Sequence, residues 1–191
     1  MMKRYNHLLI GLILNLLWLT PVWAHPHIFI DYQMELFLSQ GKMQGIKMDW
    51  RLDLMNSQLI LEEFDSNHDQ RITGQEAVAI AENMRDNLKS FEYFTQVLVN
   101  GHRIPIRTVK NIQVSYQNKQ IIYRLYLPCT IPVTPEAKQL TITPLDSTNY
   151  VAFSPLKPHP IKMSASPGIS LKVISPPKKM YDSTRFILVK K

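Results

Sequence analysis

The strongest constraint on the fold is a two-residue alternation of apolar and polar side chains that starts at His27. Residues 28–38 place apolar side chains on one face and polar side chains on the other, and residues 46–53 repeat this pattern after a turn at Ser39–Lys42. Successive residues of a strand point to opposite faces of a sheet, so this period is typical of strands with one buried face. The two runs predict a long β-hairpin.

The period changes at Leu54, where a helical insertion is expected that ends near Tyr93. Residues 54–64 predict a short helix. After a polar loop, apolar residues recur at spacings of three and four, which predicts a longer helix with one apolar stripe.

Strand patterns resume beyond the insertion, with Asn100–Gly101 as a hairpin turn. The expected strand regions are residues 96–106, 111–127, 139–146, 150–154 and 169–175. We therefore expect an α+β fold: an antiparallel β-sandwich or rolled sheet with an EF-hand-like helix–loop–helix insertion at about residues 54–93. A chain of 191 residues is long enough for one such domain, which we place at residues 25–175.

The N-terminal residues have the pattern of an export signal. Lys3 and Arg4 precede the apolar run Leu8–Leu19, and a small residue, Ala24, ends the segment. This pattern predicts a signal peptide at residues 1–24, cleavage after Ala24 and a periplasmic protein that starts at His25. A retained membrane anchor is the alternative, although the apolar run is shorter than the roughly 20 residues of a spanning helix.

Charge and cysteine content limit the partners. The net charge is +7, and the basic residues near the end predict a tail at residues 176–191 that is solvated or contacts a membrane surface. The basic residues in question are Lys178, Lys179, Arg185, Lys190 and Lys191. Nucleic acid is not an expected partner behind a signal peptide. Cys129 is the only cysteine, so neither an intrachain disulfide nor a cysteine-based metal site can form.

The polar loop between the two expected helices has the ligand spacing of an EF-hand calcium loop. Short oxygen-bearing side chains recur at alternate positions, and a glutamate closes the segment "DSNHDQRITGQE". Its candidate calcium ligands are Asp65, Asn67, Asp69, the carbonyl of Arg71, Thr73 and Glu76. Gln70 stands where such loops normally carry glycine, and a positive φ there costs about 1 kcal/mol. The alternative is a polar connector that binds no ion.

A second candidate ion site lies at the predicted mature N-terminus. On a strand, His25 and His27 point to the same side, and cleavage after Ala24 would add the α-amine of His25. These nitrogen donors suit zinc, nickel, cobalt or copper, and Asp31, on the same face as His27, is the candidate third ligand. Pro26 has no amide hydrogen. The amino-terminal copper and nickel site in which deprotonated backbone nitrogens are ligands therefore cannot form in its usual way. The alternative is a frayed polar terminus.

We find no signature of an enzyme. The sequence contains no Gly-x-Ser-x-Gly, His-Glu-x-x-His or glycine-rich phosphate loop. A copper site of the histidine-brace type would use the α-amine and ring of His25, with a third nitrogen from His102 or His159. That redox enzyme is the third alternative, after a metal-binding protein and a calcium-stabilised interaction module.

Several segments in order resemble an uncharacterised family of bacterial periplasmic proteins. They are "AHPHIFID", "MDWRLD", "LEEFDSNHDQRITGQE", "FEYFTQVLVNG" and "DSTNYVAF". The family is usually described as the periplasmic component of an ABC-type transport system, and its members are often encoded beside nickel/cobalt or zinc transporters. The resemblance implies a non-enzymatic accessory of transition-metal transport whose partner is a membrane metal permease or ABC transporter subunit.

Overall fold

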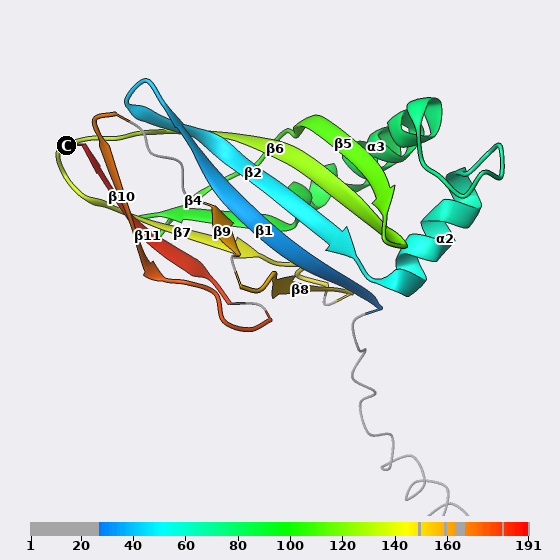
Figure 1. The fold of residues 1–191 in the computed structure, drawn as a ribbon. Helices are drawn as coiled ribbons and strands as arrows, with labels where there is room; N and C mark the ends of the chain where they lie inside the picture. The colour runs from blue at the N-terminus through cyan, green and yellow to red at the C-terminus, as the bar shows by residue number, and fades with distance from the viewer. Residues whose placement is uncertain (1–26, 149, 159, 163–166, 181, 191) are drawn as a thin grey trace, which may run out of the picture.

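Two β-sheets stacked face to face form the body of the molecule, and the helices lie together at one end (Figure 1). The computed structural model describes residues 27–148, 150–158, 160–162, 167–180 and 182–190. The predicted signal peptide, together with His25, therefore lies outside the described residues. The expected α+β sandwich is confirmed in outline.

The first sheet has the strand order β5-β6-β2-β1-β8, with β9 also paired to β1. Its strands are β1 (Ile28–Ser39), β2 (Lys42–Leu52), β5 (Lys110–Gln117), β6 (Gln120–Pro132), β8 (Val151–Pro155) and β9 (Ile161–Lys162). The predicted hairpin is confirmed: β1 and β2 are antiparallel, with Tyr32 opposite Trp50 and Met34 opposite Met48.

The first sheet is mixed, whereas we expected antiparallel pairing throughout. Strand β1 pairs in parallel with β8, where Ile28 faces Val151, and with β9, where Met34 faces Ile161. A parallel pair needs a long crossover connection, and here that connection is most of the chain. The alternation of side chains along a single strand carries no information about the direction of its neighbour, so the sequence pattern did not reveal this pairing.

The second sheet has the order β10-β11-β7-β3-β4. Its strands are β3 (Thr95–Val99), β4 (His102–Ile104), β7 (Lys138–Pro144), β10 (Ile169–Ser175) and β11 (Thr184–Lys190). The expected basic tail at residues 176–191 differs from the structure, because β11 lies between β10 and β7 and buries Phe186 and Leu188. Along β11 the buried Thr184, Phe186 and Leu188 alternate with the less buried Arg185, Ile187 and Val189, which is the pattern of a strand and not of a solvated tail.

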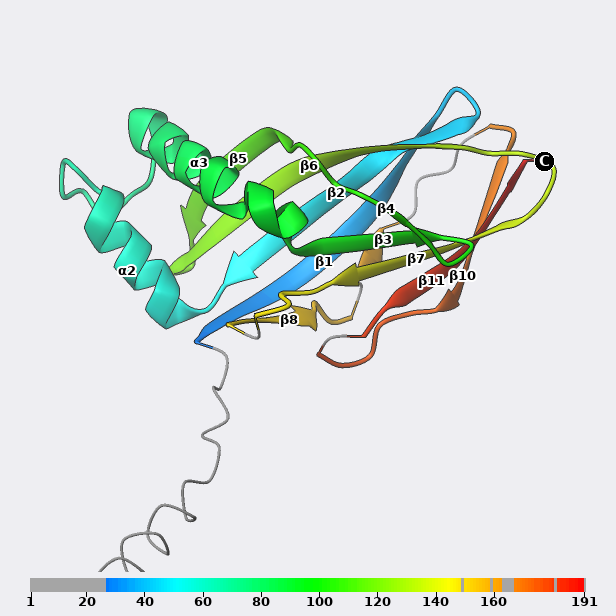
Figure 2. The ribbon, with the colours of Figure 1, turned by 180° about the vertical axis from the view of Figure 1, so that it is seen from behind.

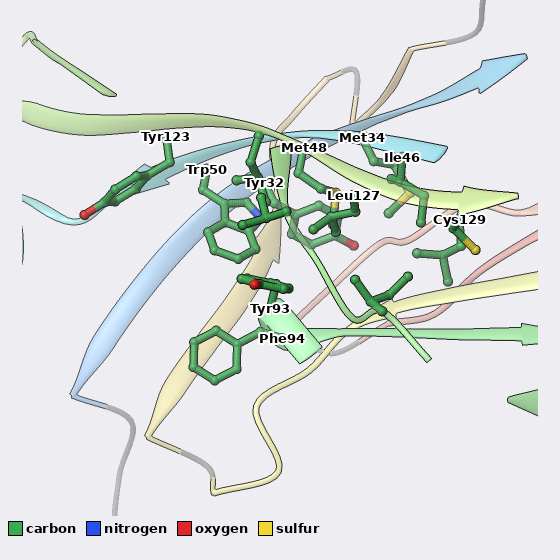
Figure 3. Packing of buried hydrophobic residues seen from close by; sticks show 14 of the residues in the cluster. Tyr32, Met34, Ile46, Met48, Trp50, Tyr93, Phe94, Tyr123, Leu127 and Cys129 are labelled. Atoms are coloured by element: carbon green, nitrogen blue, oxygen red, sulfur yellow. The ribbon is translucent and has the colours of Figure 1, made fainter. Parts of the chain in front are cut away.

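The core lies between the two sheets and is filled by the inward faces of β1 and β2 (Figure 3). Trp50 packs against Phe153 of β8 with ring centroids 5.4 Å apart, and Phe153 in turn contacts Phe94 at 5.7 Å. Phe94 directly precedes β3 of the second sheet. These aromatic contacts therefore join the two sheets, and each is worth about 0.5–1.5 kcal/mol beyond the burial of its area.

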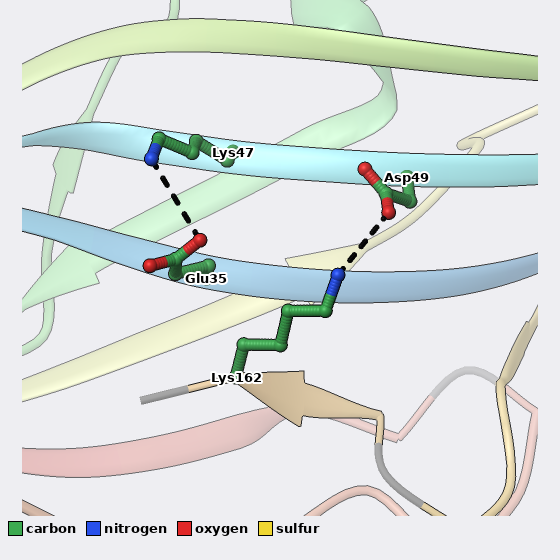
Figure 4. Close-up of polar contacts among 4 residues, drawn as sticks. All are labelled: Glu35, Lys47, Asp49 and Lys162. Atoms are coloured by element: carbon green, nitrogen blue, oxygen red, sulfur yellow. Dashed lines mark hydrogen bonds and ion pairs between the residues drawn. The ribbon is translucent and has the colours of Figure 1, made fainter. Parts of the chain in front are cut away.

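Two ion pairs lie on the outer face of the first sheet (Figure 4). Glu35 of β1 pairs with Lys47 of β2 at 3.7 Å, and Lys162 of β9 reaches Asp49 of β2 at 3.4 Å. Exposed ion pairs of this kind contribute only about 0–1 kcal/mol each. They mark this face as solvent-facing, in agreement with the polar half of the alternation.

The helices are α2 (Leu54–Phe64), α3 (Gly74–Leu88) and the 3₁₀ segment η1 (Lys89–Phe94). Helix α3 lies alongside β5, and α2 lies against β6 at the end of the sandwich (Figure 2). Both predicted helices are present, but the second ends at Leu88 and does not reach Tyr93 as expected. The 3₁₀ segment η1 completes the insertion to Phe94, and Glu92 and Tyr93 within it have positive φ angles. Among the described residues, no helix is long and apolar enough to cross a membrane.

Ser57 attaches α2 to the first sheet. Its hydroxyl is fully buried, accepts a hydrogen bond from the amide of Ile121 at 2.9 Å and donates to the carbonyl of Leu52 at 3.4 Å. These two bonds join the helix to β6 and to the end of β2.

We expect Ser57→Ala to lower the free energy of unfolding by about 1–3 kcal/mol, because the buried amide of Ile121 loses its partner. Ser90→Ala, at an exposed serine, should change it by less than about 0.5 kcal/mol. Urea unfolding followed by tryptophan fluorescence measures both. Equal stability of the two variants would contradict the role given to Ser57.

Candidate functional site

Two distant segments hold the backbone of His27. The carbonyl of Tyr150 accepts hydrogen bonds from the amides of His27 at 2.9 Å and Ile28 at 3.2 Å. On the other side, the carbonyl of His27 accepts a hydrogen bond from the side-chain amide of Asn56 in α2 at 2.9 Å. The imidazole packs on the ring of Tyr150, with centroids 5.0 Å apart and planes at 40°. His27 is exposed to solvent, yet it is not a frayed end.

Asp53 ties the start of β1 to the first turn of α2. As the N-cap of α2 its carboxylate accepts the amide of Asn56 at 2.9 Å, and its other oxygen accepts the amide of Phe29 at 2.9 Å. Desolvation acts to raise the pKa of Asp53, but these amide hydrogen bonds outweigh it and lower the pKa below the usual value of 3.8. The ionised carboxylate is thus the form that holds this junction.

A buried carboxylate fixes the segment that carries Tyr150. Asp146 is 1% exposed and accepts hydrogen bonds from the amides of Thr148 at 2.8 Å, Tyr150 at 3.1 Å and Val151 at 2.9 Å. The hydroxyl of Thr148 adds a further bond at 2.7 Å. Because Asp146 accepts amides from both ends of this turn, it fixes the backbone around Tyr150. The carbonyl of Tyr150 is thereby held where it accepts the amides of His27 and Ile28 at the start of β1.

The structure does not bring Asp31 to His27. The two residues share the outer face of the sheet, but they are four positions apart on one strand, which corresponds to about 13 Å at 3.3 Å per residue. Phe29 lies between them on that face. Asp31 instead lies opposite Arg51 of β2. His25 and His159 lie outside the described residues, and His102 belongs to β4 of the other sheet.

The loop between α2 and α3 is held by its own carboxylates. Asp65 is buried, and its two oxygens accept the amides of Asp69 at 3.1 Å and Gln70 at 2.8 Å. Gln70 has a φ of 60°, which is the left-handed conformation that an EF-hand-like loop normally has at this position. The bond to Asp65 helps to stabilise this strained residue.

Glu76, in the first turn of α3, closes the loop. One of its oxygens accepts the amide and hydroxyl of Ser66, both at 3.0 Å, and the other accepts the amide of Thr73 at 3.2 Å. The hydrogen bond from Thr73, assisted by those from Ser66, lowers the pKa of Glu76 despite its desolvation. Glu76 therefore stays ionised and buried at the point where the loop returns to its start.

The loop side chains do not form a ready-made metal cluster. In the part of the chain that the structure describes, no three His, Cys, Asp or Glu side chains converge closely enough to hold an ion. The side-chain amide of Asn67 donates a hydrogen bond to the carboxylate of Asp69 at 3.3 Å, and the backbone amide of Arg71 donates to the same carboxylate at 2.9 Å. A cleft of about 460 Å³ between α2, the loop and the β5–β6 turn opens beside Asp65 and His68.

Comparison with known proteins assigns the chain to a family. Residues 10–185 match the family described as protein of unknown function (DUF1007). The chain belongs to this family. A Haemophilus influenzae relative with the name "Uncharacterized protein" is 28% identical over 178 residues, which are 92% of this chain and 82% of the relative. No solved structure matches the chain.

The DUF1007 match spans His27, the 65–76 loop and the turn at Asp146. Sequence reasoning singled out the first two, but it missed Asn56, Asp146 and Tyr150 as the residues that hold His27. The run Asp146-Ser147-Thr148 is a signal for a turn in which the aspartate accepts nearby amides. No local signal shows that this turn meets β1.

We expect Asp53→Ala to lower the free energy of unfolding at neutral pH by about 1 kcal/mol through loss of the helix cap. Since the pKa of Asp53 is depressed in the folded state, its contribution is complete above pH 3.8 and is lost as the pH falls through the lower folded pKa. The difference between wild type and variant should therefore shrink in acid. Denaturant titrations at several pH values measure it.

Asp53→Asn provides the matched control, because asparagine is also a good helix cap but carries no charge. Its stability at neutral pH should lie closer to the wild type than that of the alanine variant. An alanine variant as stable as the wild type at neutral pH would contradict the structural role of Asp53.

Proposed function

We propose that this protein is a periplasmic, non-enzymatic accessory of a transition-metal transport system. It binds zinc, nickel or cobalt through His25 and His27, and it carries a structural calcium ion in the 65–76 loop. Its partner is a membrane metal permease or ABC transporter subunit. The periplasmic location rests on the export pattern of residues 1–24, and the transport context rests on the family resemblance.

The observation that carries the proposal is the way in which His27 is held. An exposed histidine at the first residues of a domain would normally be mobile. Here the side chain of Asn56, the carbonyl of Tyr150 and the ring of Tyr150 all contact it. A histidine that is exposed and also fixed in position loses little conformational freedom when it binds an ion.

The nitrogen donors fit a transition metal. His27 contributes an imidazole, and His25 contributes a second imidazole and, after cleavage behind Ala24, an α-amine. Asp31 is too far along β1 to complete this set. A site with few protein ligands leaves coordination positions open, whereas closed four-ligand sites are typical of structural zinc. An open site suits a protein that passes its ion to an acceptor.

The calcium assignment relies on both charged and neutral oxygens of the loop. Asp65 and Glu76 are buried carboxylates at its two ends, and Gln70 already has the left-handed conformation. The remaining oxygens come from Asn67, Asp69, Thr73 and the carbonyl of Arg71. An ion would compete with the hydrogen bonds that Ser66 and Thr73 make to Glu76, so we expect weak affinity.

A calcium-stabilised interaction module is a second candidate function. Exposed apolar side chains occur on each segment that holds His27: Phe29 is 47% exposed, Tyr150 53% and Met55 64%. Exposed apolar residues gathered from several segments are a feature of interaction surfaces. In this case alanine variants of His25 and His27 would leave partner binding intact.

The metal assignment is tested by titration of the protein purified from the periplasm, after mass spectrometry of its N-terminus. We expect zinc, nickel or cobalt to bind with a dissociation constant in the roughly micromolar range or below. The double variant His25→Ala/His27→Ala should lose this binding, and His102→Ala should retain it. Failure of all three ions to bind the wild type would disprove the proposal.

The calcium assignment is tested by thermal unfolding with and without calcium. Calcium at a hundredfold excess over its dissociation constant should stabilise the protein by about 2.7 kcal/mol. Glu76→Gln should abolish the shift, because it removes a charged loop ligand. Glu82→Gln, at an exposed position of the same helix, should retain it. A wild-type melting temperature that does not respond to calcium would refute a structural calcium ion.

A further inference from the structure

The outer face of the first sheet contains a groove that shares no residue with the His27 site or the 65–76 loop. Its volume is about 430 Å³, which lies within the roughly 300–1,000 Å³ range of small-molecule sites. The side chains that line it include Phe37 of β1, Lys47 of β2, Asn111 and Gln113 of β5, and Arg124 and Tyr126 of β6. We propose that this groove binds a sugar acid, a pyranose ring that carries a carboxylate. The inference goes beyond the proposed function and does not depend on a metal.

Irregular strand pairing shapes this part of the sheet. The register shifts between Phe37 and Leu38 in the β1–β2 pair, between Met43 and Gly45 in the β2–β6 pair, and between Lys110 and Gln113 in the β5–β6 pair. Asn111, inside the last of these irregularities, has a φ of 51°. An extra residue in one strand bends that strand and re-aims its side chains, and such bulges are common next to active sites. The groove is therefore built into the strand pairing of the sheet.

Two aromatic rings of the groove are held in fixed positions. Gly45 leaves room for Tyr126, because a Cβ atom at Gly45 would lie 2.6 Å from Cε2 and Cζ of that ring. The phenol hydroxyl of Tyr126 donates a hydrogen bond to the carbonyl of Gln44 at 2.7 Å. Phe37 packs edge-on against Tyr126, with centroids 5.9 Å apart and planes at 86°, and it is still 38% exposed. A ligand that packs on these rings therefore has little side-chain freedom to remove.

Arg124 gives the groove a positive charge that no carboxylate balances by direct contact. Among the described residues, Arg124 forms no ion pair. Asp49, which lies opposite Arg124 on β2, pairs with Lys162 of β9 at 3.4 Å (Figure 4). The other cation of the lining, Lys47, pairs with Glu35 at 3.7 Å. A guanidinium group can hold a carboxylate through two parallel hydrogen bonds, so Arg124 is the anion-binding group of the groove.

The remaining side chains of the lining favour a sugar over other carboxylates. The side-chain amides of Asn111 and Gln113 can both donate and accept hydrogen bonds, as the hydroxyl groups of a sugar do. The C–H groups of a pyranose ring are apolar and can pack on the rings of Phe37 and Tyr126. A simple aromatic acid would use these rings and Arg124 but would leave both amides to water. A sugar acid offers a partner to all three kinds of group.

The experiment compares two sugars that differ by a carboxylate. N-acetylmuramic acid is N-acetylglucosamine with a lactic acid ether on its ring, so the two probes share the pyranose. The protein purified from the periplasm is titrated with each sugar and followed by the NMR signals of its backbone amides. We expect N-acetylmuramic acid to shift the signals of Asn111 and Gln113 with a dissociation constant of about 1 mM or below. N-acetylglucosamine should bind at least about tenfold more weakly, because it lacks the charge-assisted hydrogen bonds to Arg124.

Three variants separate the charge from the aromatic contact. Arg124→Gln removes the charge at an exposed position and should abolish the preference for N-acetylmuramic acid. Phe37→Ala should weaken the binding of both sugars by a similar factor and leave the preference in place. Arg51→Gln is the matched control, because it removes an exposed charge from β2 at a residue that does not line the groove. It should change neither affinity.

Several outcomes would overturn the proposal. They are the absence of binding, equal affinity of the wild type for the two sugars, and a preference that survives in Arg124→Gln. Phenylacetate and tetraglutamate represent the competing occupants, an aromatic acid and an acidic peptide. If either binds more tightly than N-acetylmuramic acid, the groove is not a sugar-acid site. None of these results bears on metal binding, because the groove and the His27 site have no residue in common.

Discussion

The structure depends on the burial of one face of the β1–β2 hairpin against the second sheet. The inward side chains of these two strands, from Tyr32 and Met34 to Met48 and Trp50, are almost completely removed from water. Burial of each such side chain contributes about 1.5–3 kcal/mol. Because Trp50 contacts Phe153, and Phe153 contacts Phe94, the same burial positions β8 and the start of β3. The outward face is left free for charged residues.

The candidate metal site lies where this hairpin meets the helical insertion and the turn before β8. Two of these segments contact His27, which begins the hairpin: Asn56 of the insertion bonds its carbonyl, and Tyr150 before β8 accepts its amide and packs against its ring. Asp53 and Asp146 act in the same way on different segments: each carboxylate accepts several amides and thereby holds a short stretch of backbone. Charge-assisted hydrogen bonds of this kind are stronger than neutral ones, which explains how a junction at the surface stays ordered.

The elements that the sequence predicts well are those with a local cause. The alternation along β1 and β2 results from one buried and one exposed face, and the stripe along α3 results from helical spacing, so both could be recognised. Strand β11 was missed because proline and charged residues around it resemble a tail, and only its place between β10 and β7 makes Phe186 and Leu188 core residues. The bonds of His27 to Asn56 and Tyr150 join residues far apart in the chain, and no local pattern indicates them.

The parallel pairing of β1 with β8 has a consequence for the order in which the molecule is completed. His27 is synthesised more than one hundred residues before Tyr150, so the environment of the histidine cannot form until the later part of the chain has joined the first sheet. During synthesis, which starts at the N-terminus, the β1–β2 hairpin and the helices are made before the segment that carries Tyr150. His27 thus acquires its fixed position only in the finished molecule, and partly made or truncated chains lack it.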